Sequence, residues 1–241
     1  MTRVYVNQAL SVGSEFALPD DAFRHLVQAL RLRAGDGFIA FNGQGGEYRA
    51  SLLDVGKRTA SARIDAHDEV DRESPLQLTL AQCVSKGDRM DYTIQKAVEL
   101  GVSRIVPLVS SRSVVRLDGD RWERKTEHWQ GVIASACEQS GRTRLPTLAA
   151  PQDLGRWLDA PRPAALELTL APTAPASLRS LAAPTAAVSL LVGPEGGLSG
   201  AEIEHAQRSG FTAVRVGPRV LRTETAGVAT LAAIQSLWGD W

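Results

Sequence analysis

The stretch LLVGPEGGLSGAEIE, residues 190–204, predicts a strand that turns sharply into a helix. Its apolar run ends at Gly193, and Ser199 with Glu202 forms a capping box that starts the helix. Glycine has no Cβ, so the backbone between these points can approach a ligand and adopt positive φ. We call residues 193–198 the elbow. Ligands of α/β sheets bind beyond the carboxyl ends of strands, which is where the elbow falls.

A second glycine turn lies in VRVGPRVLRTETA, residues 214–226. Taken alone, either turn could be an ordinary strand-to-helix connection. A P-loop requires GxxxxGK[ST], and a dinucleotide fingerprint requires GxGxxG with an acidic residue about 20 positions later. The elbow sequence GPEGGLSG has neither the lysine nor the spacing. The pattern therefore argues against both of these phosphate-binding cofactor sites.

The surrounding sequence predicts an α/β fold. Apolar runs that are typical of strands alternate with stretches whose apolar residues keep helical spacing, such as Met90, Ile94 and Val98. This alternation predicts a mostly parallel sheet covered on both faces. The expected strands are residues 76–84, 104–110, 164–170, 186–193 and 211–217. One expected helix has Trp122, Trp129 and Ile133 on its apolar face, a second ends at Gly210, and a third, buried helix covers residues 223–238.

The first 70 residues have a different pattern of apolar residues and glycines. Short apolar alternations separated by glycines predict a small β-barrel, with one helix striped by Phe23, Leu26 and Leu30. The charged stretch DRESP, residues 71–75, ends in proline and is the best candidate for a linker. We therefore expect two domains, residues 1–72 and 73–241.

Bulk composition is that of an ordinary globular protein, with 44% hydrophobic and 22% charged residues. The formal net charge is zero, so a nucleic acid would have to bind a local basic patch. Cys83 and Cys137 lie far apart with no CxxC pattern, which argues against a disulfide framework or a zinc knuckle. With no signal-peptide or membrane-span pattern, we expect a cytoplasmic protein without membrane or metal partners.

The two glycine turns together resemble the C-terminal signature of the 16S ribosomal RNA uracil-N3 methyltransferases, a family of SPOUT, or trefoil-knotted, methyltransferases. Three other stretches resemble this family: KGDRMDYTIQKAVELGVSRIVPLVSSRS (86–113), ACEQSGRTRLP (136–146) and HLVQALRLRAGD (25–36). The resemblance runs from about residue 3 to the end. It implies a PUA-like RNA-binding barrel, a knotted domain that binds S-adenosylmethionine, and a homodimer whose partner subunit completes each active site. The implied substrate is 16S ribosomal RNA or the small ribosomal subunit.

The cofactor's adenine needs backbone hydrogen bonds and an apolar slot, which strand-end residues beside flexible glycines can provide. Leu170 is added by the family pattern, and Glu195 is expected to fix the elbow. The expected cofactor-binding residues are Leu170, Leu191, Gly193, Glu195, Gly197, Val216, Gly217, Leu221, Arg222 and Thr225.

Methyl transfer from a sulfonium is an in-line displacement and needs no metal. When the uracil N3 proton leaves, charge spreads over the ring carbonyls, and a fixed cation can stabilise it. Arg222 is the expected cation; the alternative is a structural arginine paired with Glu224 or a helix end. Glu138 is expected to orient the base or accept its proton, and its alternative is a capping or interface carboxylate.

RNA is expected to contact local basic residues, although each could equally belong to a solvated face. The candidates are Arg24, His25, Arg31 and Arg33 around the N-terminal helix, and Arg112, Arg116, Arg142 and Arg144 in the second domain. Two rival functions remain open. One is a SPOUT enzyme that methylates a ribose 2′-hydroxyl or a tRNA base. The other is a non-catalytic RNA-binding assembly protein.

Overall fold

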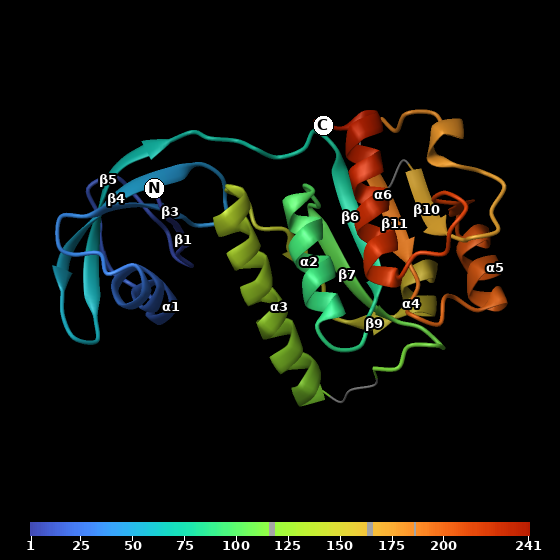
Figure 1. Cartoon of the computed structure of the whole chain (residues 1–241), viewed down its shortest axis with the longest axis horizontal. Coiled ribbons are helices and arrows are strands. Elements are labelled where there is room, and N and C mark those ends of the chain that lie inside the picture. Colours follow the sequence, from blue (N-terminus) through green and yellow to red (C-terminus); the bar gives the residue numbers. More distant parts are fainter. Residues whose placement is uncertain (116–118, 163–165, 186) are drawn as a thin grey trace. The chain divides into compact units, whose positions relative to one another are not determined.

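A computed structural model describes residues 1–115, 119–162, 166–185 and 187–241, and these form two compact units (Figure 1). The first unit comprises residues 1–73 and 134–145, and the second comprises residues 74–133 and 146–241. Residues 134–145, which the sequence placed in the second domain, thus pack with the first unit. The functional division into an RNA-binding domain and a methyltransferase domain stays a prediction.

The first unit is built on a mostly antiparallel sheet of short strands, as the glycine-punctuated sequence predicts. Its strand order is β1-β3-β4-β5-β2, and only the β1–β3 pair is parallel. Phe38, Leu52 and Ile64 are fully buried in its core, together with Leu26 from the predicted helix. The elements are β1 Arg3–Tyr5, β2 Glu15–Ala17, α1 Asp20–Phe23, a π-helical turn Arg24–Ala29, β3 Gly37–Phe41, β4 Glu47–Val55 and β5 Ala60–Asp68.

Specific hydrogen bonds join the end of helix α3, Gly119–Ser140, to this unit. The Glu138 carboxylate accepts the Tyr5 amide at 2.8 Å. The Arg142 guanidinium is buried against Glu73, with Nε 3.1 Å from Oε1. Arg72 donates to the Gly141 carbonyl at 2.9 Å. These bonds link residues more than 60 positions apart, so local sequence pattern could not reveal them.

The second unit contains a sheet whose named strand pairs are all parallel. In the described part of the chain the order is β12-β10-β11-β6-β7-β8, with β9 also beside β7. The strands are β6 Gln77–Cys83, β7 Arg104–Val109, β8 Thr147–Leu148, β9 Gln152–Asp153, β10 Leu166–Leu170, β11 Ala187–Val192 and β12 Thr212–Val214. This arrangement confirms the predicted α/β class with a mostly parallel sheet. The strand order does not by itself reveal a knot, and the knot stays a prediction.

Helices cover both faces of this sheet. Helices α2, Arg89–Glu99, and α6, Thr223–Trp238, pack on each other and lie in front of the strands in Figure 1. Helices α4, Leu154–Asp159, and α5, Gly200–Arg208, share a core with Leu191 of β11. Side chains of a strand alternate between faces, so Val192, which lies near Gly227 of α6, faces the other side.

The predicted boundaries of helix α5 are confirmed in detail. Ser199 Oγ accepts the Glu202 amide at 3.3 Å, and Glu202 Oε2 accepts the Ser199 amide at 2.7 Å, so the capping box is closed. Gly210 follows the helix with φ of +99°, the left-handed conformation that favours glycine. The capping box fixes where the elbow ends and the helix begins.

Candidate active site

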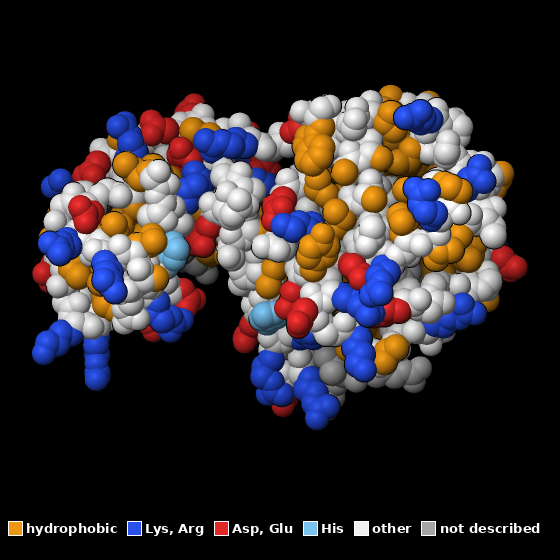
Figure 2. All heavy atoms as spheres, viewed as in Figure 1, with side chains coloured by type: hydrophobic (Ala, Val, Ile, Leu, Met, Phe, Trp, Pro, Cys, Tyr) orange, Lys and Arg blue, Asp and Glu red, His pale blue; other side chains and the backbone are white. Residues whose placement is uncertain are grey.

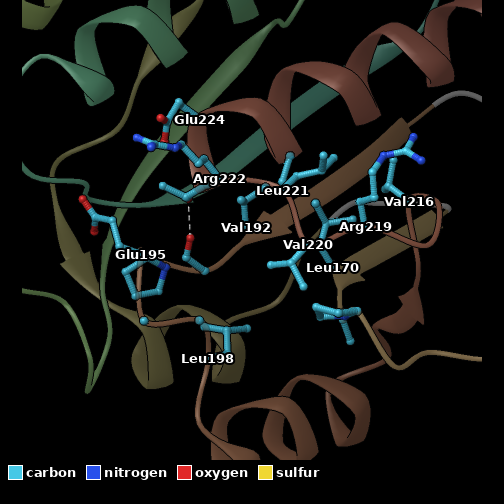
Figure 3. Close-up of a pocket in the computed structure, with 18 of the residues that line it drawn as sticks. Leu170, Val192, Glu195, Leu198, Val216, Arg219, Val220, Leu221, Arg222 and Glu224 are labelled. Atoms are coloured by element: carbon cyan, nitrogen blue, oxygen red, sulfur yellow. Dashed lines mark hydrogen bonds between the residues drawn. The ribbon is translucent and has the colours of Figure 1, made fainter.

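A pocket of about 550 Å³ lies at the carboxyl ends of β10, β11 and β12 in the second unit (Figure 3). The elbow forms one wall, and the second turn with the start of α6 forms another. Leu170, Ala171 and Pro172, at the end of β10, complete the lining. The parallel sheet thus brings the two glycine turns together, as strand ends in an α/β sheet predict.

The pocket combines an apolar wall with open backbone. Figure 3 shows the apolar side chains of Leu170, Val192, Leu198, Val216 and Leu221 around it. Two glycines add bare backbone: Gly197 has φ of +67° and Gly217 has φ of +72°. A Cβ added at either glycine would meet no atom within 4 Å, so the space beside each stays open.

Thr223 fixes the start of α6 to the elbow. Its hydroxyl donates to the Gly193 carbonyl at 2.6 Å, the bond that is dashed in Figure 3. The same oxygen accepts from Gln82 Nε2 at 3.0 Å, and both side chains are buried. The Thr223 hydroxyl group therefore links Gln82 of β6 and the start of α6 to the elbow.

Two arginines and a backbone amide hold the elbow in place. Glu195 Oε1 accepts the Lys86 amide at 2.9 Å and Arg89 Nη1 at 3.1 Å. Burial opposes ionisation of Glu195, but these hydrogen bonds outweigh it and lower the pKa of the carboxyl group. Arg112 Nη1 donates to the carbonyls of Gly196 and Leu198, at 3.0 and 3.4 Å. The elbow is therefore braced by side chains, as expected for Glu195.

Arg222 lies at the N-cap of α6 and is exposed at the pocket. Among the described residues, its guanidinium has no hydrogen bond or ion pair. The predicted alternative paired it with Glu224, but Glu224 Oε1 lies 3.9 Å from Arg89 Nε instead. Arg222 is thus a cation at the pocket with its donors available, which fits the expected electrostatic role.

Most of the expected cofactor-binding residues line this pocket, and their roles stay predictions. Leu191 does not line it, because its side chain is fully buried in the core with α4 and α5. Thr225 does not line it either, and is exposed in the first turn of α6. The expected residues that do line it are Leu170, Gly193, Glu195, Gly197, Val216, Gly217, Leu221 and Arg222.

Glu138 belongs to the first unit, whereas all residues that line the pocket belong to the second. Burial raises the pKa of its carboxyl group, although the hydrogen bond from the Tyr5 amide acts in the opposite direction. Within the first unit, Glu138 therefore bonds to the backbone of β1. A role for Glu138 in the reaction stays a prediction.

The expected RNA-binding residues fall into two groups. Arg24, His25, Arg31 and Arg33 are exposed on the first unit, and Arg24 pairs with Asp21. The others bond within the chain: Arg112 to the elbow, Arg142 to Glu73, and Arg144 to the Gln44 carbonyl. Arg116 lies outside the described residues. Arg112 and Arg144 are exposed as well, whereas Arg142 is buried. Contact of any of these residues with RNA stays a prediction.

No helix in the described ranges is long and apolar enough to cross a membrane. Within the same ranges, no three His, Cys, Asp or Glu side chains gather in a way that could hold a metal ion.

Comparison with known families identifies the chain. Residues 72–235 match a family model described as an RNA methyltransferase domain. Residues 18–65 match an RNA methyltransferase PUA domain. Fold and site therefore define a two-part RNA methyltransferase. The chain belongs to this RNA methyltransferase family, which confirms the predicted enzyme class and the PUA-like N-terminal region.

Similar proteins extend this result over the whole chain. Ribosomal RNA small subunit methyltransferase E of Buchnera aphidicola, subspecies Schizaphis graminum, is 31% identical over 99% of this chain and 97% of its own. The Neisseria gonorrhoeae protein of the same name, solved with S-adenosyl methionine, is 41% identical with a TM-score of 0.93, covering 100% and 99% of the two chains. A Legionella pneumophila protein solved with bound SAM is 38% identical with a TM-score of 0.96, at the same coverage.

Proposed function

We propose that this protein transfers a methyl group from S-adenosylmethionine to N3 of a specific uridine in 16S ribosomal RNA. The observation that carries the proposal is the pocket where both glycine turns meet. Two solved proteins that share this fold, at 38% and 41% identity, have titles that name bound S-adenosylmethionine. The names of full-length relatives support the small ribosomal subunit RNA as substrate.

The pocket residues fit this cofactor. A volume of about 550 Å³ suits a ligand of this size class, since small-molecule pockets measure about 300–1,000 Å³. Its apolar wall can hold an adenine ring, and the bare backbone at Gly197 and Gly217 allows close approach without a side chain. The carboxylates of Glu195 and Glu224 also line the pocket, and each pairs with Arg89.

The chain's own residues would act by positioning and charge stabilisation. When bound, S-adenosylmethionine supplies an electrophilic methyl group on a positively charged sulfur. The elbow and the second turn would hold that group in place, and Arg222 would stabilise the negative charge that uracil gains when N3 loses its proton. Arg222 has no partner among the described residues, so it can turn toward a bound base without breaking an internal ion pair.

A homodimer in the cytoplasm belongs to the same proposal. Tyr92 of α2 and Leu237 of α6 are 47% and 42% exposed, and Val220 of the second turn is 81% exposed. Figure 2 shows hydrophobic side chains gathered over α2 and α6. A second copy of the chain would cover such a surface beside the pocket. Both cysteines are free and buried, which suits a reducing compartment.

Nucleoside mass spectrometry of ribosomal RNA from a deletion strain tests the proposed function. The proposal predicts loss of N3-methyluridine from 16S RNA and its return with a plasmid copy. Loss of a ribose 2′-O-methyl group or of a tRNA base modification would favour the rival enzyme. If no modification is lost and calorimetry detects no S-adenosylmethionine binding, the protein is a non-catalytic RNA-binding factor.

A further inference from the structure

Arg89, the first residue of α2, lies between carboxylates from the two glycine turns. Its Nη1 atom is 3.1 Å from Glu195 Oε1 in the elbow, and its Nε atom is 3.9 Å from Glu224 Oε1 in the first turn of α6. Arg89 also lines the pocket. One guanidinium group therefore connects two segments that face each other across the site.

Both carboxylates pair with this arginine. Glu195 and Glu224 side chains are only 25% and 15% exposed, so water screens them incompletely. Glu224 Oε2 is buried and has no hydrogen-bond partner in the described part of the chain. Without Arg89, two negative charges would be left near each other at the pocket, which destabilises the arrangement.

We propose that Arg89 is a positioning residue that sets the spacing between the elbow and the start of α6, and thereby the shape of the cofactor pocket. This inference rests on the proposed function for its effect on S-adenosylmethionine. Arg89 acts through Glu195 and Glu224, whereas Arg222 faces the reacting base. Loss of Arg89 should therefore weaken cofactor binding and leave the chemical step largely intact.

Hydrogen exchange of the full-length, ligand-free protein tests the positioning role without the cofactor. Arg89→Met removes the charge and keeps an apolar stem. Amide exchange in residues 193–198 should become about fivefold faster, because a partly exposed ion pair contributes up to about 1 kcal/mol. The matched control is Lys96→Met on the same helix, since Lys96 forms a salt bridge with Glu99 and neither residue lines the pocket. That control should leave exchange in the elbow unchanged.

Calorimetry and steady-state kinetics test the effect on binding. Arg89→Met should raise the Kd and the KM for S-adenosylmethionine about five- to tenfold, with kcat within about twofold of wild type. Arg89→Lys should rescue only part of this loss, because a point charge cannot span both carboxylates as a guanidinium does. Glu195→Gln should weaken binding in the wild-type background and have little further effect in Arg89→Met.

The outcomes separate this inference from the proposed function. Unchanged exchange in the elbow and unchanged cofactor affinity in Arg89→Met would overturn the positioning role. Strictly additive effects of Arg89→Met and Glu195→Gln would also overturn it, because they would indicate a direct contact of Arg89 with the ligand. If wild type binds no S-adenosylmethionine while Arg89→Met still speeds exchange in the elbow, the proposed function fails and the positioning role holds.

Discussion

At the residue scale, a side chain added at Gly197 would enter the pocket directly. Its φ of +67° is strained for any residue with a Cβ, and an added Cβ would point into open space. Gly197→Val should therefore place a branched side chain where the ligand lies. We expect S-adenosylmethionine affinity to fall at least tenfold by calorimetry while circular dichroism shows a folded protein.

Gly200→Ala is the matched control for this substitution. Gly200 starts helix α5, does not line the pocket, and has free space beside its backbone at an ordinary φ. This variant should bind the cofactor as wild type does. Wild-type affinity in Gly197→Val would remove Gly197 from the site.

Arg222 carries the second prediction at this scale. Removal of one preorganised charge-stabilising donor typically lowers the rate by about 10²–10³. Arg222→Ala should lower single-turnover methylation by that order, with RNA affinity little changed, because several basic residues share RNA binding. Arg222→Lys should recover only part of the rate. A structural arginine would instead lower the melting temperature, which we expect to stay constant since Arg222 has no partner in the described ranges.

The same variant has a matched control in the second turn. Arg215 is exposed and does not line the pocket, so Arg215→Ala tests the loss of one nearby positive charge. Its single-turnover rate should stay close to wild type. Full activity in a well-folded Arg222→Ala protein would contradict the catalytic role of Arg222.

At the element scale, the capping box joins the elbow to helix α5. Burial opposes ionisation of Glu202, but hydrogen bonds from Ser111 and Ser199 outweigh it and lower the pKa of its carboxyl group. A carboxyl group with a lowered folded-state pKa stabilises the fold above its unfolded pKa, and this stability is lost as pH falls through the folded pKa. The relevant unfolded value is near 4.5.

Glu202→Gln should therefore destabilise the protein by about 1 kcal/mol near pH 7. The difference from wild type should shrink well below pH 4.5, where the wild-type carboxyl group also becomes protonated. Urea unfolding at several pH values measures both quantities. Glu204→Gln on the same helix removes an exposed charge and should leave stability unchanged at every pH. A deficit that persists undiminished in acid would exclude the charge as its cause.

Element boundaries were predictable because their signals are local. The capping box, the Gly210 stop and the Met90–Val98 stripe each lie within a few residues of the feature they predict. The face that a buried strand residue occupies was harder to predict. The fully apolar end of β11 carries no polar alternation, so Leu191 was expected in the pocket that Val192 in fact lines.

Long-range partners were not predictable. Arg89 and Lys86 lie in the stretch 86–113 that resembles the methyltransferase family. The spacing of apolar residues in this stretch predicts only which side chains face the core. Their bonds to Glu195 span more than 100 positions. Arg142 was expected at the RNA surface for the same reason, because its burial against Glu73 appears only once the chain folds.

At the scale of the whole molecule, this Glu73–Arg142 pair is one of the contacts that join residues 134–145 to the rest of the first unit. Arg142 is 4% exposed, so removing the Glu73 carboxylate takes a salt-bridge partner away from a buried guanidinium group. Glu73→Ala should destabilise the protein by about 3 kcal/mol in chemical unfolding, and Glu73→Ala with Arg142→Met should be less damaging than Glu73→Ala alone. Glu69→Ala, an exposed acidic change nearby, serves as the control.

The same substitutions separate a structural role of Arg142 from RNA binding. If the buried pair dominates, Arg142→Met lowers stability and leaves the RNA affinity of the folded protein unchanged. Weaker RNA binding in Arg142→Met, with wild-type stability, would instead assign this arginine to the RNA surface.

The activity of the whole molecule is tested most directly by labelling in vitro. Small ribosomal subunits from a deletion strain are incubated with the purified chain and methyl-labelled S-adenosylmethionine, and the 16S RNA is digested to nucleosides. We predict label in N3-methyluridine, in one RNA fragment, and its loss with Arg222→Ala or Gly197→Val. Label in a 2′-O-methylated nucleoside, or no label in RNA with a folded protein that binds the cofactor, would contradict uracil-N3 methylation.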